Sequence, residues 1–83
     1  MSRAYKRLAA MKRNPRDDWT IDDVIALCGS FGLDCKPPAS GSHYVVSHPL
    51  VEGLLTVPAR RPIKPLYIGL LVELVECVLE RTK

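Results

Sequence analysis

The chain has 83 residues, of which 47% are hydrophobic and 25% charged, and its net charge is +3, a composition that predicts one small domain. Its longest apolar run, Leu66 to Val72, is too short to cross a bilayer, and no apolar run follows the N-terminal charges as in a signal peptide. The three cysteines show no C-x-x-C spacing, so we expect a cytoplasmic protein without a disulfide framework or a zinc site. The sequence contains no Gly-rich phosphate loop and no cofactor motif, so we expect no cofactor.

The basic residues are unevenly placed along the chain. Six of the twelve lysines and arginines lie in the first sixteen residues, and a second cluster consists of Arg60, Arg61 and Lys64. Locally basic surface suits a polyanion such as nucleic acid, although solvated charge is the commoner explanation of any one cluster.

Residues 2–13 are expected to form a short basic helix with Ser2 as its N-cap, and Asn14-Pro15 ends it. Its apolar stripe, made by Ala4, Leu8 and Met11, is thin. The sequence leaves open whether this segment packs on the domain or is an arm that orders on binding. We therefore divide the chain into a basic N-terminal helix or arm, 1–18, and a domain, 19–83.

A second helix is predicted from about residue 20 to 31. Thr20 is a favourable N-cap, Asp23 occupies the reciprocal position of a capping box, and Gly32 is a typical helix terminator. Apolar residues recur at helical spacing and predict one buried face, consisting of Ile21, Val24, Ile25, Cys28 and Phe31.

Three short strands and a final helix follow. The strands are expected at 33–36, 42–47 and 54–57, with a turn at 49–53 between the second and third. Pro65 stands at the favoured first position of the last helix. The core face predicted for that helix consists of Tyr67, Ile68, Leu71, Leu74, Val75 and Val78. Its further apolar residues, Leu66, Leu70 and Cys77, widen the apolar surface beyond one contact and favour a protein partner, although a packed small core explains them nearly as well.

This element order predicts an α+β domain of α-β-β-β-α type with an extra N-terminal helix or arm. Two helices would cover one face of a three-stranded antiparallel sheet, which makes two layers. The double-stranded RNA-binding fold (dsRBD) has the same order, but a fold does not by itself imply a function.

His43 is the first candidate for chemistry. Gly41 allows a sharp turn, and the alternation from Ser42 onward places His43 at the mouth of a strand, with Tyr44 and Val46 on the opposite side. Histidine is the side chain best suited to proton transfer near neutral pH, although a single histidine in a strand is usually packed or solvated. His48, before a proline, is interpreted as a turn or cap residue. The two histidines point to opposite faces of the strand, which argues against a shared metal site.

A family resemblance rests on the segment G-S-H-Y-V-V-S-H-P, followed after a turn by L-T-V-P-A-R-R-P-I-K-P-L-Y-I-G-L-L-V-E-L-V. This pattern resembles the HicA family of toxin ribonucleases from toxin–antitoxin pairs, over about residues 19–80. The resemblance implies a dsRBD-like fold, cleavage of mRNA, and neutralisation by a cognate HicB-type antitoxin. It also implies that the histidine of G-S-H, here His43, is catalytic. Two features differ from the family: Arg60 replaces the histidine of a frequent V-P-x-H motif, and residues 2–18 exceed the shortest members.

Metal-independent RNA cleavage needs a proton carrier and cations that hold the phosphate. We expect His43 to be the general acid or base, with the phosphate bound by Ser42, Arg60, Arg61 and Lys64. Tyr44 is expected in the core, with base stacking as the alternative, and Tyr67 in the core. Two other classes stay open: a non-catalytic RNA-binding module or inactive toxin relative, which Arg60 favours, and a protein that serves only partner assembly.

Overall fold

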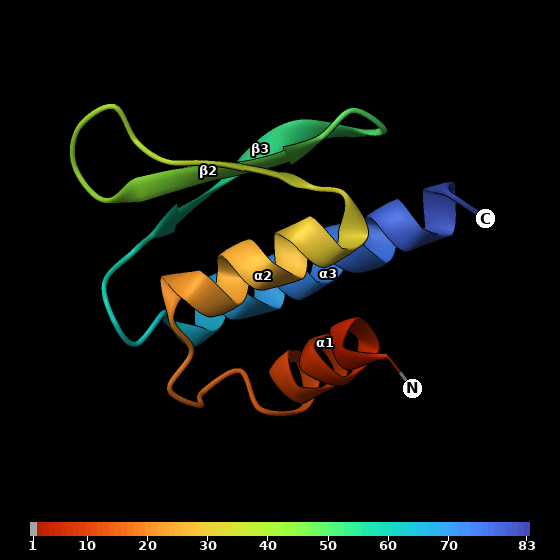
Figure 1. The fold of residues 1–83 in the computed structure, drawn as a ribbon, viewed down its shortest axis with the longest axis horizontal. Helices are drawn as coiled ribbons and strands as arrows, with labels where there is room; N and C mark the ends of the chain where they lie inside the picture. The colour runs from red at the N-terminus through yellow and green to blue at the C-terminus, as the bar shows by residue number, and fades with distance from the viewer. Residues whose placement is uncertain (1) are drawn as a thin grey trace.

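The computed structural model describes residues 2–83, which form three helices and one three-stranded antiparallel sheet (Figure 1). In chain order the elements are α1 (Arg3–Arg13), α2 (Ile21–Phe31), β1 (Asp34–Lys36), β2 (His43–His48), β3 (Val51–Pro58) and α3 (Pro65–Arg81). This order confirms the predicted α+β class and the α-β-β-β-α arrangement behind an N-terminal helix. Within residues 2–83, no helix combines the length and the apolar character needed to cross a membrane.

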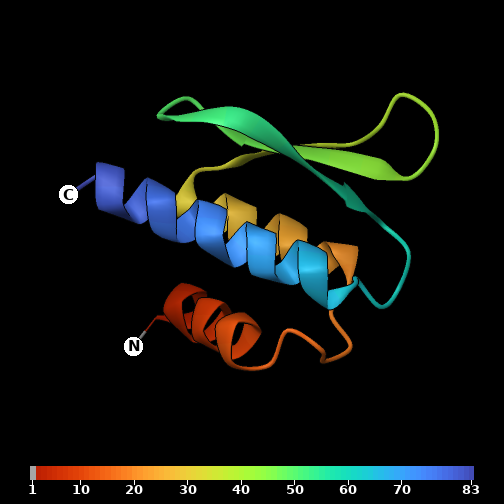
Figure 2. The same ribbon diagram turned by 180° about the vertical axis from the view of Figure 1, so that it is seen from behind.

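The sheet has the order β1-β2-β3, and α2 and α3 together cover one of its faces (Figure 1). Viewed from behind, α1 lies against the helical layer on the side away from the sheet (Figure 2). The expected two layers are therefore present, and α1 adds a third. Consequently, the other face of the sheet is not covered by any described helix.

The sequence left open whether the N-terminal segment packs on the domain, and in the structure it does. α1 contacts both α2 and α3, and its Leu8 and Met11 belong to the same buried cluster as the residues of the sheet and the other helices. The Lys12 ammonium also lies 2.6 Å from a carboxylate oxygen of Glu76 on α3. Residues 3–13 therefore share one core with the rest of the chain.

The predicted helix caps are confirmed. The Ser2 hydroxyl accepts a hydrogen bond from the Tyr5 backbone N–H, and Thr20 and Asp23 form a reciprocal capping box at the start of α2. α2 ends at Gly32, whose φ of 73° lies in the left-handed region that glycine adopts without strain. α3 begins at Pro65, as expected from its missing N–H.

The buried face of α2 differs from the prediction at two positions. Ile25 is 40% exposed, and Leu27, which was not assigned to the face, is fully buried. The reason is helical geometry: Val24, Leu27, Cys28 and Phe31 follow the i, i+3, i+4, i+7 spacing, whereas Ile25 lies one residue beyond the stripe. On α3, Val72 is similarly buried, while Tyr67 and Leu74 are only partly buried.

The third strand is longer than predicted. β3 begins at Val51 rather than Leu54, and the turn from β2 is reduced to Pro49 and Leu50. The glycine that suggested a turn, Gly53, has a φ of 89° and lies where the pairing of β2 with β3 shifts register. It therefore allows an irregularity within a continuing strand.

Candidate nucleic-acid interface

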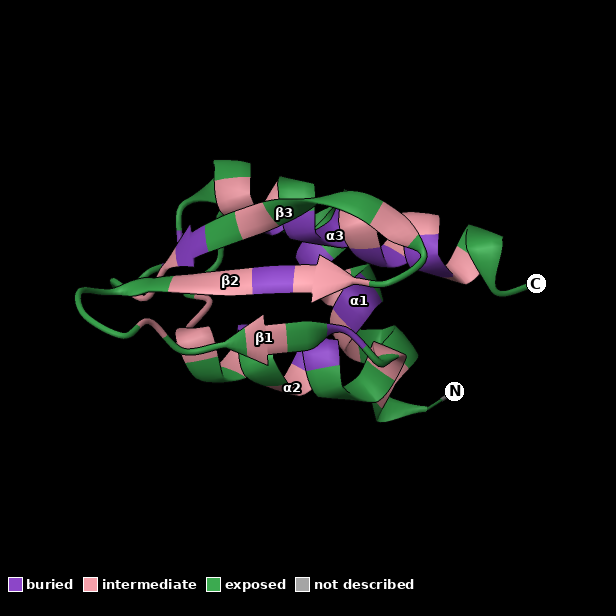
Figure 3. Ribbon diagram, turned by 90° about the horizontal axis from the view of Figure 1, so that it is seen from above, coloured by how far each residue is buried: buried purple, intermediate pink, exposed green. Residues whose placement is uncertain are grey.

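His43 is the first residue of β2 and is exposed. It pairs across the sheet with Pro58, the last residue of β3. The buried residues of these two strands are Val46 and Val57, which face the helices. Figure 3 views the sheet from the side that no described helix covers. Because His43 lies three residues from the buried Val46, strand alternation places it on this side.

The same end of the sheet continues into the basic loop, defined as Arg60–Lys64. Beside the pairing of His43 with Pro58, the Ala59 N–H donates a 2.7 Å hydrogen bond to the Ser42 carbonyl. The backbone of the G-S-H segment is thus joined directly to the start of the basic loop. Ser42 itself is exposed, and its backbone carbonyl is committed to this contact.

Two contacts hold the basic loop on the domain. The Ile63 side chain is 1% exposed and belongs to the core, and the Ile63 N–H donates a 2.8 Å hydrogen bond to the Trp19 carbonyl. Trp19 immediately precedes the N-cap of α2 and is itself fixed, because its indole N–H donates to the Asn14 carbonyl at 2.8 Å. The loop is therefore attached to the domain at Ile63, between Arg61 and Lys64.

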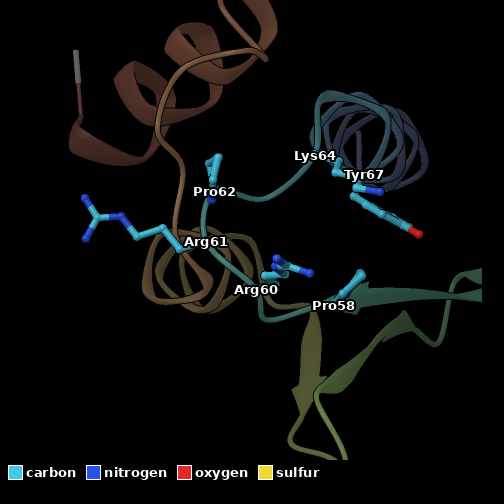
Figure 4. A pocket seen from close by; sticks show the side chains of 6 residues that line it. All are labelled: Pro58, Arg60, Arg61, Pro62, Lys64 and Tyr67. Carbon is cyan, nitrogen blue, oxygen red and sulfur yellow. The ribbon is translucent and has the colours of Figure 1, made fainter.

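A cavity of about 440 Å³ lies between the basic loop, the end of β3 and the first turn of α3. It is lined by Pro58, Arg60, Arg61, Pro62, Lys64 and Tyr67. In Figure 4 the Arg60 side chain lies beside Pro58, and the side chains of Lys64 and Tyr67 lie next to each other at the start of α3. This volume lies within the range typical of small-molecule sites, and the lining combines three uncharged rings with three cationic residues.

The Arg61 side chain is oriented differently from that of Arg60. Its side chain extends away from Arg60 (Figure 4), and its Nε donates hydrogen bonds to both carboxylate oxygens of Asp18, at 3.0 and 3.2 Å. Its Nη2 donates a further hydrogen bond to the same carboxylate. These hydrogen bonds hold the pKa of Asp18 below its usual value and raise the pKa of Arg61. Arg61 therefore has an anionic partner within the chain.

Five residues were expected at the site, and the structure brings them to one end of the sheet in two groups. Ser42 and His43 lie at the start of β2, and Arg60 and Lys64 lie in the adjoining cavity, with Arg61 turned toward Asp18. His43 does not line the cavity. Its partner across the sheet, Pro58, does line the cavity and so connects His43 to it.

Sequence reasoning missed the role of Tyr67, which was assigned to the core but is partly buried and lines the cavity. The apolar walls at Pro58 and Pro62 were also missed. The feature of the sequence that could have indicated these walls is the proline on each side of the basic cluster. Proline fixes φ, so these residues indicate a loop with little conformational freedom.

His48, interpreted as a turn or cap residue, is the last residue of β2 and caps the turn, because its Nδ1 accepts a 3.0 Å hydrogen bond from the Leu50 N–H. The three cysteines are free thiols. Burial is the larger cause, and the neighbouring Cys35 the smaller one, that together raise the pKa of the Cys28 thiol to about 12.

Among residues 2–83 no group of three or more His, Cys, Asp or Glu side chains is arranged to hold a metal ion.

Comparison with known proteins adds no assignment. No protein-family model matches the chain, and searches of curated proteins and of solved structures found no similar protein.

Proposed function

We propose that the chain is a cytoplasmic RNA endonuclease of the HicA type with a dsRBD-like fold, which cleaves mRNA without a metal and is neutralised by a HicB-type antitoxin. The observation that carries this proposal is the pairing of His43 with Pro58, which brings the candidate proton carrier and the basic loop to one end of the sheet. A nuclease needs both groups within reach of a single phosphate.

The proposed reaction is transesterification at the ribose 2′-hydroxyl. His43 takes the proton as the 2′-oxygen attacks phosphorus, the bond to the 5′-oxygen breaks, and that oxygen receives a proton from His43 or from water. The products are a 2′,3′-cyclic phosphate and a 5′-hydroxyl. Arg60 and Lys64 stabilise the charge on the phosphate, since both are free of the partner that engages Arg61.

The toxin part of the proposal rests on the resemblance of residues 19–80 and is supported by exposed apolar surface. Leu54, Leu66 and Leu70 are 72%, 66% and 38% exposed. Leu54 and Leu70 line one surface depression, and Leu66 lies one helical turn before Leu70 on α3. Contiguous exposed apolar side chains of this kind mark surfaces at which a protein partner binds.

The test compares wild type, H43A and the control H48A on a long single-stranded RNA with a chelator present throughout. Wild type and H48A are expected to cut the RNA to 5′-hydroxyl products, and H43A is not. Equal unfolding midpoints for the three proteins would establish that they are equally folded. A product with a 5′-phosphate and a 3′-hydroxyl would exclude this route.

A specific observation favours a second candidate, a non-catalytic RNA-binding module or inactive toxin relative. Arg60 occupies the position at which the family often has its second histidine, and His43 does not line the cavity. This candidate predicts salt-sensitive RNA binding that is equal for wild type and H43A, with cutting by neither.

A further inference from the structure

The cavity beside the basic loop has a feature that phosphate binding does not explain. Phosphate needs cations and N–H donors, yet three of the six lining residues carry rings without charge, namely Pro58, Pro62 and Tyr67. Apolar walls of this kind suit a flat, uncharged group that is attached to a phosphate.

Tyr67 presents its ring to the cavity from a rigid position. It lies in the first turn of α3, where its backbone N–H donates a 3.0 Å hydrogen bond to the Lys64 carbonyl, and the next residue, Ile68, is fully buried. The ring is therefore held by a helix and points into the same space as Arg60 and Lys64 (Figure 4).

We propose that this cavity binds one unpaired nucleobase of single-stranded RNA, stacked on Tyr67 and enclosed by Pro58, while Arg60 and Lys64 hold the attached phosphate. The inference rests on the RNA substrate of the proposed function and adds a binding site to it. Every base has a π-face, so stacking on an aromatic ring adds affinity with little dependence on sequence. A base-paired strand cannot enter the cavity, because its bases are stacked within the helix.

The test uses a twelve-nucleotide 2′-O-methyl oligouridine, which cannot be cleaved by attack of a 2′-hydroxyl, so binding is measured whether or not the protein is a nuclease. The full-length wild type is compared with Y67L and Y67F. The control is Y5L, which changes a tyrosine on α1 that is 49% exposed and stacks edge-on against Phe31. Inorganic polyphosphate, which has the charge without the bases, serves as the second ligand.

Y67L is expected to bind the oligonucleotide roughly 5- to 100-fold more weakly than wild type, and Y67F and Y5L are expected to bind it within about twofold of wild type. Polyphosphate binding should not differ among the four proteins. Equal oligonucleotide binding by Y67L and wild type would overturn the inference. An equal loss of polyphosphate binding in Y67L would also overturn it, because Tyr67 would then shape the loop rather than stack on a base.

The same proteins are assayed on unmodified RNA so that the two proposals can fail separately. Cleavage by wild type together with unchanged binding by Y67L would reject the base site and leave the nuclease. Tyr67-dependent binding without any cleavage would reject the nuclease and leave the base site.

Discussion

Arg60 and Arg61 are neighbours in the chain, but their guanidinium groups have different surroundings. Arg60 points into the cavity beside Tyr67, whereas Arg61 is hydrogen-bonded to both carboxylate oxygens of Asp18 (Figure 4). A guanidinium that already has a carboxylate partner gains less from a phosphate than one that has none. The two arginines therefore form a matched pair for locating the phosphate site.

We expect R60M to weaken binding of single-stranded RNA about tenfold or more, since a charge-assisted hydrogen bond is lost. R61M removes the same charge and should weaken binding less than threefold. Titration of fluorescently labelled oligouridine at one fixed salt concentration measures both. Equal losses in the two variants would show that RNA responds to the net charge of the loop and not to a site at Arg60.

Cys28 makes the stability of the folded chain depend on pH in the alkaline range. Burial, with a smaller effect from Cys35, raises the pKa of the Cys28 thiol from 9.0 to about 12. The unfolded chain therefore loses this proton at lower pH than the folded chain. The resulting contribution to stability is complete below pH 9 and is lost as the pH rises toward 12.

The variant C28A should be less stable than wild type at pH 7 by roughly 0.5–3 kcal/mol, because a buried side chain is truncated. The difference should shrink between pH 8 and pH 11, since only wild type loses stability through this thiol. Urea unfolding at a series of pH values measures this difference in the free energy of unfolding. Titratable groups that both proteins share contribute equally and therefore do not affect the difference. A difference that is constant with pH would mean that Cys28 titrates normally in the folded chain.

At the scale of elements, α1 is the helix whose status the sequence could not decide. Met11 is completely buried where α1 meets α2 and α3, so the helix contributes to the core itself. We expect M11A to destabilise the protein by about 2–5 kcal/mol, as for other buried large side chains. The control K6A, an exposed position on the same helix, should change stability by less than about 0.5 kcal/mol. An arm that orders only on binding would give equal unfolding midpoints for M11A, K6A and wild type.

The sequence predicted those elements whose boundaries depend on local chemistry. The Thr20–Asp23 capping box, Gly32 and Pro65 act within a few residues of themselves, so their helix boundaries are within one residue of the prediction. Gly53 was misread because a positive φ is common to turns and to bulges, and only pairing with β2 distinguishes the two. Likewise, a helical period alone does not decide whether Ile25 or Leu27 faces the core when both are apolar.

The candidate site was predictable only in part, for a similar reason. G-S-H and the basic cluster are each visible as short motifs, but their meeting at the His43–Pro58 pair depends on the register of β2 and β3. Asp18 and Arg61 are separated by 43 positions in the chain, and no local pattern indicates that they pair. The contribution of Tyr67 to the cavity likewise depends on how α3 meets the loop.

At the scale of the whole molecule, the positive charges of the first turn of α1 are separated from those of the basic loop. The structure measures 36 × 27 × 19 Å along its principal axes, and the first turn of α1 and the basic loop lie toward opposite ends of the longest axis (Figures 1 and 2). Charges this far apart act nearly independently, because the Debye length is about 10 Å at 0.1 M salt. The charges of the first turn of α1 and those of the basic loop can therefore be tested separately.

The double variants R3Q/K6Q and R60Q/K64Q each remove two positive charges from the chain. If the loop holds the RNA, R60Q/K64Q should reduce the slope of log affinity against log salt by about 1.4, which corresponds to two lost phosphate contacts on a single strand. R3Q/K6Q should leave that slope within about 0.3 of wild type, although the net charge is the same in both variants. A binding series from 50 to 300 mM salt measures the slopes. If both variants reduced this slope equally, part of the RNA would lie on α1. The bound strand would then have to pass around the helical layer as well as the end of the sheet.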